Sequence, residues 1–115
     1  MVKYDLKGLK LVFGGMLPRI DQDKELASYR FRDTRPDGIE LSFNFCGVER
    51  WVSFFITCAN GVCAAAISVS DFQEVRVVDT APGHRVIEIL WGDEKSQPRK
   101  IILELDGTRV LKLDA

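Results

Sequence analysis

The amino-acid sequence predicts a mainly β protein, an antiparallel sandwich or half-open barrel of about eight or nine strands, with room for one short N-terminal helix. Two observations lead to this fold class. Residues 51–70 contain no Asp, Glu, Lys or Arg and are interrupted only by Asn60-Gly61. Most of the other segments are short, alternate apolar with polar residues, and are separated by Gly, Pro or Asp. Alternation with a period of two is typical of strands with one buried face.

The uncharged stretch is interpreted as a β-hairpin around Asn60-Gly61. This dipeptide favours a two-residue type I′ turn, because Asn and Gly tolerate the positive φ that the turn requires. The turn determines which residues face each other, and large side chains then lie opposite small ones. The pairs on one face are Val52–Val69, Phe54–Ile67, Ile56–Ala65 and Cys58–Cys63. The pairs on the other face are Trp51–Ser70, Ser53–Ser68, Phe55–Ala66 and Thr57–Ala64.

A transmembrane helix is the rival interpretation of this stretch, because about twenty apolar residues span a bilayer. The hairpin is favoured, since Ser53, Thr57 and Ser68 lower the hydrophobicity and Asn60-Gly61 would lie in the middle of the membrane. The many β-branched and aromatic residues also suit strands. We therefore expect no membrane partner.

The length of 115 residues indicates one β-rich domain, residues 1–115. Its 16 basic and 17 acidic residues give a net charge of −1, and neither sign is concentrated in one half of the chain. A basic surface for direct nucleic-acid binding is therefore not expected.

The three cysteines, Cys46, Cys58 and Cys63, are an odd number without metal-ligand spacing, which favours reduced thiols and a cytoplasmic location. The first seven residues lack the apolar core of a signal peptide, and this supports the same location. If Cys58 and Cys63 face each other across the hairpin, a strained disulfide can form on oxidation. The sequence is compatible with both the reduced and the disulfide-bonded state of this pair.

The N-terminal segment is ambiguous between helix and strand. Leu6, Leu9, Val12, Phe13 and Met16 recur at helical spacing, whereas Leu9, Leu11 and Phe13 alternate as in a strand. We favour a short helix that ends at Gly14-Gly15. A charged connection, Arg19–Glu25, follows it.

The remaining strands are predicted from alternation and from turn residues. Leu26–Asp33 and Ile39–Phe45 form a pair joined by a tight turn at Pro36-Asp37-Gly38. After the uncharged hairpin, we expect strands at about Gln73–Asp79 and Val86–Trp91, with a turn at residues 81–84 between them.

The end of the chain is predicted to form a second hairpin, with a type I′ turn at Asp106-Gly107. In this register Leu103 faces Val110, Ile101 faces Lys112, and Glu104 forms an ion pair with Arg109. An exposed pair of this kind contributes about 0.2–1 kcal/mol, so it indicates register more than it stabilises the fold.

The sequence lacks the motifs of known catalytic and metal sites. The single histidine, His84, follows Pro82-Gly83, which favours a surface turn residue over a catalytic base. Asp21, Asp23 and Glu25 alternate like ligands for Ca²⁺ or Mg²⁺, but Lys24 lies among them and the Gly of a calcium loop is missing. No phosphate loop, nucleophile elbow or Cys–His set occurs. We therefore expect no enzymatic activity, no cofactor and no metal.

The second face of the uncharged hairpin is the more suggestive feature. Trp51 and Phe55 lie there in a row with Ser53 and Thr57, and aromatic residues are enriched at the centres of protein interfaces. Two interpretations stay open: a covering helix or sheet makes these residues part of the core, or the face is exposed and binds a partner.

Four short features resemble the bacterial immunity proteins that neutralise polymorphic toxins, particularly the immunity protein 50 family. They are Phe13-Gly14, Pro18, Glu25-Leu26 at the start of a strand, and a closing strand pair within Ile101–Leu113. The family has a Phe-Gly-x-Trp-Pro segment and a His-x-x-Glu step, and this sequence lacks the Trp and the His. The resemblance implies a small cytoplasmic, non-enzymatic protein that binds a toxin domain and blocks its active site or substrate entry.

The residues that would bind such a toxin follow from charge and from the aromatic face. A nuclease toxin needs a basic substrate groove, which acidic loops can block. The candidate toxin-binding residues are therefore Asp21, Asp23, Glu25, Asp93 and Glu94 in loops, and Trp51 and Phe55 on the hairpin. A small ligand-binding barrel or sandwich stays open as the alternative, and it would need an apolar cavity of about 300 Å³ or more.

Overall fold

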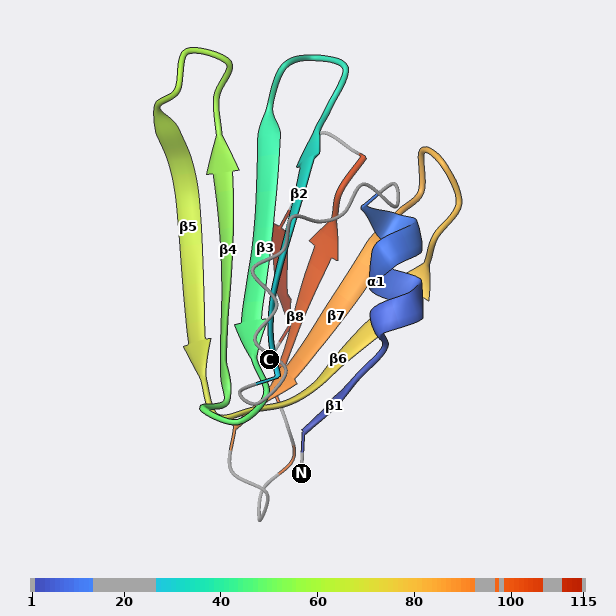
Figure 1. The fold of residues 1–115 in the computed structure, drawn as a ribbon, viewed down its shortest axis with the longest axis vertical. Coiled ribbons are helices and arrows are strands. Elements are labelled where there is room, and N and C mark those ends of the chain that lie inside the picture. The colour runs from blue at the N-terminus through green and yellow to red at the C-terminus, as the bar shows by residue number, and fades with distance from the viewer. Residues whose placement is uncertain (1, 14–26, 93–96, 98, 107–110, 115) are drawn as a thin grey trace.

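The computed structural model describes residues 2–13, 27–92, 97, 99–106 and 111–114 of the chain. Two β-sheets lie face to face in this part of the protein, and one short helix lies beside them (Figure 1). The predicted mainly β sandwich is therefore confirmed. The described strands form two separate sheets rather than a barrel.

The four-stranded sheet contains the uncharged hairpin and the hairpin before it. Its strands follow chain order: β2 (Ser28–Thr34), β3 (Glu40–Cys46), β4 (Trp51–Thr57) and β5 (Cys63–Ser70). Neighbouring strands are antiparallel throughout. The apolar residues predicted for the inner face of β3 and β4 are buried, as in the cross-strand pair Phe43–Phe54, whereas Cys63 and Ala65 on β5 are exposed.

The five-stranded sheet is built from the rest of the chain in the order β1-β6-β7-β8-β9. β6 (Phe72–Asp79), β7 (Val86–Trp91), β8 (Arg99–Glu104) and β9 (Leu111–Asp114) are antiparallel neighbours. β1 (Lys3–Tyr4) joins the edge parallel to β6, with Lys3 opposite Glu74. β1 was not predicted from the sequence, because two residues show no periodicity and the pairing of β1 with β6 is not local.

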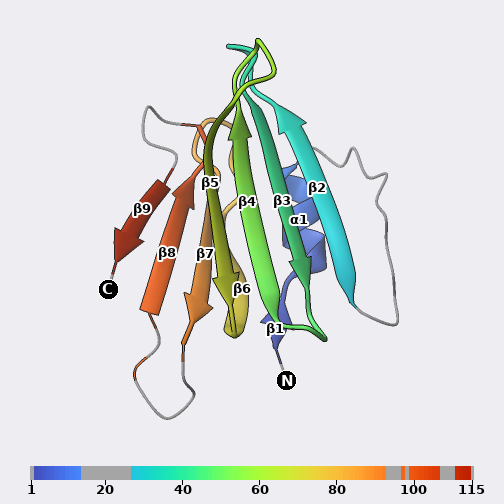
Figure 2. The same ribbon diagram turned by 90° about the vertical axis from the view of Figure 1, so that its left-hand side faces the viewer.

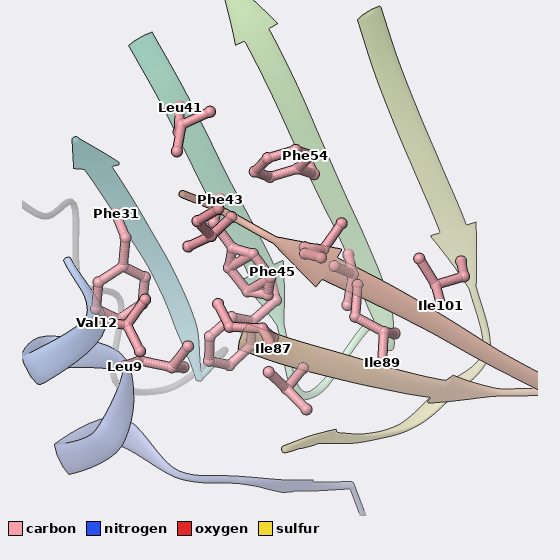
Figure 3. Packing of buried hydrophobic residues seen from close by; sticks show 14 of the residues in the cluster. Leu9, Val12, Phe31, Leu41, Phe43, Phe45, Phe54, Ile87, Ile89 and Ile101 are labelled. Carbon is pink, nitrogen blue, oxygen red and sulfur yellow. The ribbon is translucent and has the colours of Figure 1, made fainter. Parts of the chain in front are cut away.

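The core fills the space between the two inner faces, with a third contribution from α1 (Leu6–Val12) (Figure 3). The predicted helix is thus confirmed, and its N-terminus is capped by Asp5, whose side chain accepts a hydrogen bond from Gly8 N at 2.9 Å. Leu9 and Val12 point from the helix into the core, and the ring of Phe13 stacks on Phe31 with 5.4 Å between centroids.

The register of the uncharged hairpin is confirmed from the Trp51–Ser70 pair to the Ile56–Ala65 pair, whereas the predicted turn is wrong. Gly61 N donates to Cys58 O at 2.9 Å and Cys58 N donates to Val62 O at 2.8 Å, so the loop has three residues, 59–61. Only Gly61 takes a positive φ, of 86°, and Asn60 avoids the left-handed region that a type I′ turn would impose on it. A register shift between Ile56 and Thr57 accommodates the extra loop residue.

This turn also separates the two cysteines that were expected to face each other. Thr57 lies opposite Cys63, and Cys58 N donates a hydrogen bond to Val62 O. Cys46, Cys58 and Cys63 are all free thiols. The predicted cross-strand opposition of Cys58 and Cys63 is therefore wrong.

The register predicted for the C-terminal hairpin is wrong by one residue. Leu103 pairs with Leu111, and Ile101 pairs with Leu113 rather than with Lys112. The observed register places apolar residues opposite apolar residues, which the β-sandwich requires on its inner face. The predicted ion pair of Glu104 with Arg109 involves a residue outside the described part of the chain.

Candidate functional site

The outer face of the four-stranded sheet is the candidate site, because it gathers the hairpin residues singled out in the sequence. In Figure 1 this sheet lies in front of the five-stranded sheet, and no described helix or strand covers its outer side. The register places the following residues on it, and we call them the outer face: Ser28, Arg30, Arg32, Thr34, Glu40, Ser42, Asn44, Cys46, Trp51, Ser53, Phe55, Thr57, Ala66, Ser68 and Ser70.

Trp51 and Phe55 are half-buried on this face and do not belong to the core. No described helix or strand forms a second layer over them. Phe55 lies between Ser42 and Ala66 on the neighbouring strands, and Trp51 lies beside Ser70 at the other end of β4. Both side chains therefore keep part of their surface exposed.

Asn44 lies opposite Ser53, the outer-face residue of β4 between Trp51 and Phe55. It is the one polar residue among the buried residues described, at 8% exposed. Its Nδ2 donates to Ser42 Oγ at 3.3 Å and to Ser53 Oγ at 3.4 Å. Because a buried amide with its hydrogen bonds made has little freedom to rotate, these contacts tie the side chain of Asn44 on β3 to β4, the strand that carries both Trp51 and Phe55.

Two arginines extend the outer face toward β2. Arg30 lies across from Asn44 and Arg32 lies across from Ser42, and both side chains are exposed. Arginine, tryptophan and phenylalanine are enriched at interface centres, and serine and asparagine supply adaptable hydrogen bonds in binding surfaces. Arg30, Arg32 and Asn44 were not among the candidates predicted from the sequence, although their period-two spacing with Ser28 and Ser42 places them on the outer face.

The acidic loop candidates stay untested. Asp21, Asp23, Glu25, Asp93 and Glu94 lie outside the described residues. Of the seven candidate residues, the structure therefore places only Trp51 and Phe55, and it brings them together on one face.

A second site of interest is a cluster of charged residues around Arg85, which directly precedes β7. Its guanidinium donates to Asp106 from Nε at 2.8 Å and from Nη2 at 2.7 Å, to Val12 O from Nη1 at 2.7 Å, and to Asp33. The side chains of Arg85 and Asp106 are only 13% and 17% exposed. We call Arg85, Asp33 and Asp106 the Arg85 cluster; it joins α1, β2 and the end of β8.

The electrostatics of the Arg85 cluster favour the charged forms of Arg85 and Asp106. Hydrogen bonds from Arg85 lower the pKa of Asp106 below its usual value of 3.8, against the opposing effect of burial. Hydrogen bonds to Asp106 raise the pKa of Arg85, with burial again opposing and Asp33 reinforcing. Neither group exchanges a proton near neutral pH, so the cluster is suited to holding elements together rather than to acid–base chemistry.

A pocket of about 250 Å³ lies next to this cluster, and its lining includes Asp79, His84, Arg85, Glu104 and Asp106. His84 is exposed and follows the turn at residues 81–83, which agrees with a surface turn residue. No group of three His, Cys, Asp or Glu residues within the described ranges is arranged to hold a metal ion. No described helix is long and apolar enough to cross a membrane.

Comparison with known proteins extends the fold assignment. No family model and no curated protein matches the chain. A solved structure of a contact-dependent growth inhibition toxin–immunity protein complex from Klebsiella pneumoniae 342 contains a chain with 14% sequence identity and a TM-score of 0.73. The match covers 98% of this chain and 93% of that chain. The protein therefore has the same fold as a chain of a toxin–immunity protein complex.

Proposed function

We propose that this protein is a non-enzymatic immunity protein that binds a cognate bacterial toxin domain and neutralises it by blocking its active site or substrate entry. The observation that carries the proposal is the shared fold, which extends over nearly the whole of both chains. The resemblance of short sequence features to toxin immunity proteins points to the same function independently of the fold.

The fold match by itself suits either component of such a complex, and the chemistry of this chain favours the inhibitor. A toxin that cuts nucleic acid needs acid–base or metal-binding residues that converge on one site. In the described ranges, the one histidine lies in a surface turn and the best-connected charged residues, those of the Arg85 cluster, are bonded to one another. An inhibitor needs a binding surface, which the outer face supplies.

The outer face is the proposed docking surface for the toxin. Trp51 and Phe55 are rigid aromatic groups with few rotatable bonds, so little conformational entropy is lost when a partner covers them. Both lie on β4, which Asn44 of β3 joins through Ser53, and such preorganisation lowers the cost of association. The loops with Asp21, Asp23, Glu25, Asp93 and Glu94 stay a second proposed contact, for a toxin with a basic groove.

Growth protection tests this function. The protein is expressed together with the toxin domain encoded by the adjacent gene, and growth and complex formation are measured. We expect the wild type to restore growth and to form a stoichiometric complex. Absence of both protection and binding would contradict the proposal.

A double variant, Trp51→Ala with Phe55→Ala, tests the docking surface. We expect it to fold and to bind the toxin at least tenfold more weakly, because buried interface aromatics contribute about 2 kcal/mol or more each. The control is Val78→Ala, which shortens a side chain that is 54% exposed on the other sheet. Equal affinity for the toxin in the double variant and the control would show that the toxin binds at another surface.

The ligand-carrier alternative receives no support from a described feature. The residues that would line an apolar cavity pack against one another instead, with ring centroids of Phe43 and Phe45 only 6.0 Å apart. The 250 Å³ pocket lies next to the charged Arg85 cluster.

A further inference from the structure

We propose that β5 binds its partner by strand addition: a segment of the toxin pairs with the open edge of β5 and continues the four-stranded sheet. This inference rests on the proposed function and specifies the form of contact. It starts from a difference between β5 and the other edge strands.

Four strands form the edges of the two described sheets, and three of them carry charges. β2 contains Arg30, Arg32 and Asp33, β9 contains Lys112 and Asp114, and β1 is two residues long and contains Lys3. Charges and short length are the usual means by which proteins prevent other chains from pairing with a sheet edge. β5, with eight residues, has the sequence CAAAISVS and none of this protection.

The first half of β5 is also open on both of its faces. Residues 63–66 are all exposed, although Ala65 shares the inner face with the buried Ile56 opposite it. Val62, just before the strand, is 59% exposed. Figure 1 shows β5 at the left-hand margin of its sheet, and in Figure 2, which looks onto that side, β5 lies toward the viewer. Burying this uncharged segment would remove apolar surface from water at no cost in charge desolvation.

The register identifies which main-chain groups of β5 are available. Asp71 N donates to Arg50 O at 2.8 Å, one position beyond the Trp51–Ser70 pair. Hydrogen-bonded and non-hydrogen-bonded pairs alternate along antiparallel strands. The N–H and C=O groups of Ile67 and Val69 therefore bond to β4, and those of Ala66, Ser68 and Ser70 point to the open edge.

A second copy of this chain is the competing occupant, and geometry favours the toxin. Two β5 strands related by a two-fold axis would extend the sheet in its own plane, so the outer faces with Trp51 and Phe55 would stay uncovered. A contact confined to one eight-residue strand pair is also smaller than the roughly 1,200 Å² that stable interfaces bury. A toxin chain need not obey this two-fold symmetry, so it can pair with β5 and cover the outer face at the same time.

The chemistry of β5 also describes the segment it would accept. The side chains on the outer face of the strand are Ala66, Ser68 and Ser70, which offer neither charge nor bulk. The added strand therefore has uncharged, β-branched or aromatic residues opposite them, since large side chains pack well across from small ones.

Ser68→Pro tests the proposal, because proline removes the outward N–H of residue 68 and none of the bonds to β4. Proline is tolerated on edge strands where its nitrogen faces solvent. The matched control is Ser68→Ala, which removes the side-chain hydroxyl and keeps the N–H. The probe is the toxin domain whose toxicity the wild-type protein suppresses in the growth test. We expect Ser68→Pro to weaken toxin binding about tenfold or more and Ser68→Ala to bind like the wild type.

Ala65→Lys provides a second, side-chain-based test, since it adds an inward-facing charge to an exposed position and should leave the fold intact.

Hydrogen exchange completes the experiment: the amides of Ala66, Ser68 and Ser70 should exchange quickly in the free protein and become protected in the complex. Wild-type affinity in both Ser68→Pro and Ala65→Lys, with no new protection, would overturn strand addition while the immunity function stands. A free protein of twice the monomer mass that Ser68→Pro converts to monomer would assign β5 to a second copy and would likewise overturn the proposal.

Discussion

The Arg85 cluster and the β5 edge differ in whether their polar groups are hydrogen-bonded within the fold. At the Arg85 cluster, one guanidinium bonds to two carboxylates and a main-chain carbonyl, from three separate parts of the chain. At β5, an eight-residue strand carries no charge and leaves main-chain groups of alternate residues open. Groups that are satisfied internally stabilise the fold, whereas groups left open are available to a partner. Variants at the two places should therefore affect different measurements.

The largest effect is expected for Arg85→Ala. This change leaves Asp33 and Asp106 partly buried without their cation and breaks the bond to Val12 O, so we expect the free energy of unfolding to fall by about 2–3 kcal/mol. The measurement is urea denaturation at neutral pH. The control is Arg76→Ala, which removes an exposed ion pair with Glu74 and should cost no more than about 0.5–1 kcal/mol. Equal losses in the two variants would show that the cluster is no more important than a surface pair.

The next largest effect is expected at the tip of the uncharged hairpin. Gly61→Val places a β-branched residue at a φ of 86°, and we expect a loss of about 1–2 kcal/mol. No atom lies within 4 Å of the added Cβ, so the cost comes from the backbone rather than from a clash. Gly61→Asn is the matched variant, because Asn tolerates the left-handed region and should lose less. Identical denaturation midpoints for the two variants would argue against this turn.

Acid should weaken the Arg85 cluster before it affects β5. The pKa of Asp106 is lowered in the folded protein, mainly by hydrogen bonds from Arg85, so the folded state holds the proton of this carboxyl less tightly than the unfolded chain does. The stability that Asp106 contributes is therefore complete above its ordinary pKa of 3.8 and is lost as pH falls through the lower folded value. Denaturation between pH 7 and pH 2 should show a shallower acid dependence for Asp106→Asn than for wild type. An unchanged slope would indicate that other carboxyls dominate.

The same contrast explains how much the sequence could predict. The strands of the four-stranded sheet follow from local alternation, and the pairing of Trp51 with Ser70 follows from the sorting of faces. The Arg85 cluster could not be foreseen, because Asp106, Asp33 and Val12 are 21, 52 and 73 residues from Arg85. β1 was missed for the same reason, since its pairing with β6 is not local.

The turns and the C-terminal register show a different limit of sequence reasoning. Asn60-Gly61 suits both a two-residue type I′ turn and a three-residue loop with Gly in the left-handed region. The loop observed places only Gly61 at positive φ. The loop at Pro36-Asp37-Gly38 has the same form, with Gly38 N bonded to Arg35 O at 2.9 Å and Arg35 N bonded to Ile39 O at 2.8 Å. The Asn60-Gly61 signal therefore located the tip of the uncharged hairpin but left its loop length open by one residue, and a one-residue change alters which residues face each other.

The smallest effect on stability is expected for Ser68→Lys on β5, and this small effect is informative. Ser68 is exposed opposite Ser53, and its main-chain groups point away from β4, so a lysine there buries no charge and should change the free energy of unfolding by less than about 0.5 kcal/mol. The same charge restores the protection that the other edge strands have, and it should lower toxin affinity and reduce self-association at high concentration. Urea denaturation and light scattering of the free protein measure the two properties separately. A stability loss above about 1 kcal/mol would mean that the β5 edge is already covered within the folded chain, and the contrast with the Arg85 cluster would then fail, because both regions would be satisfied internally.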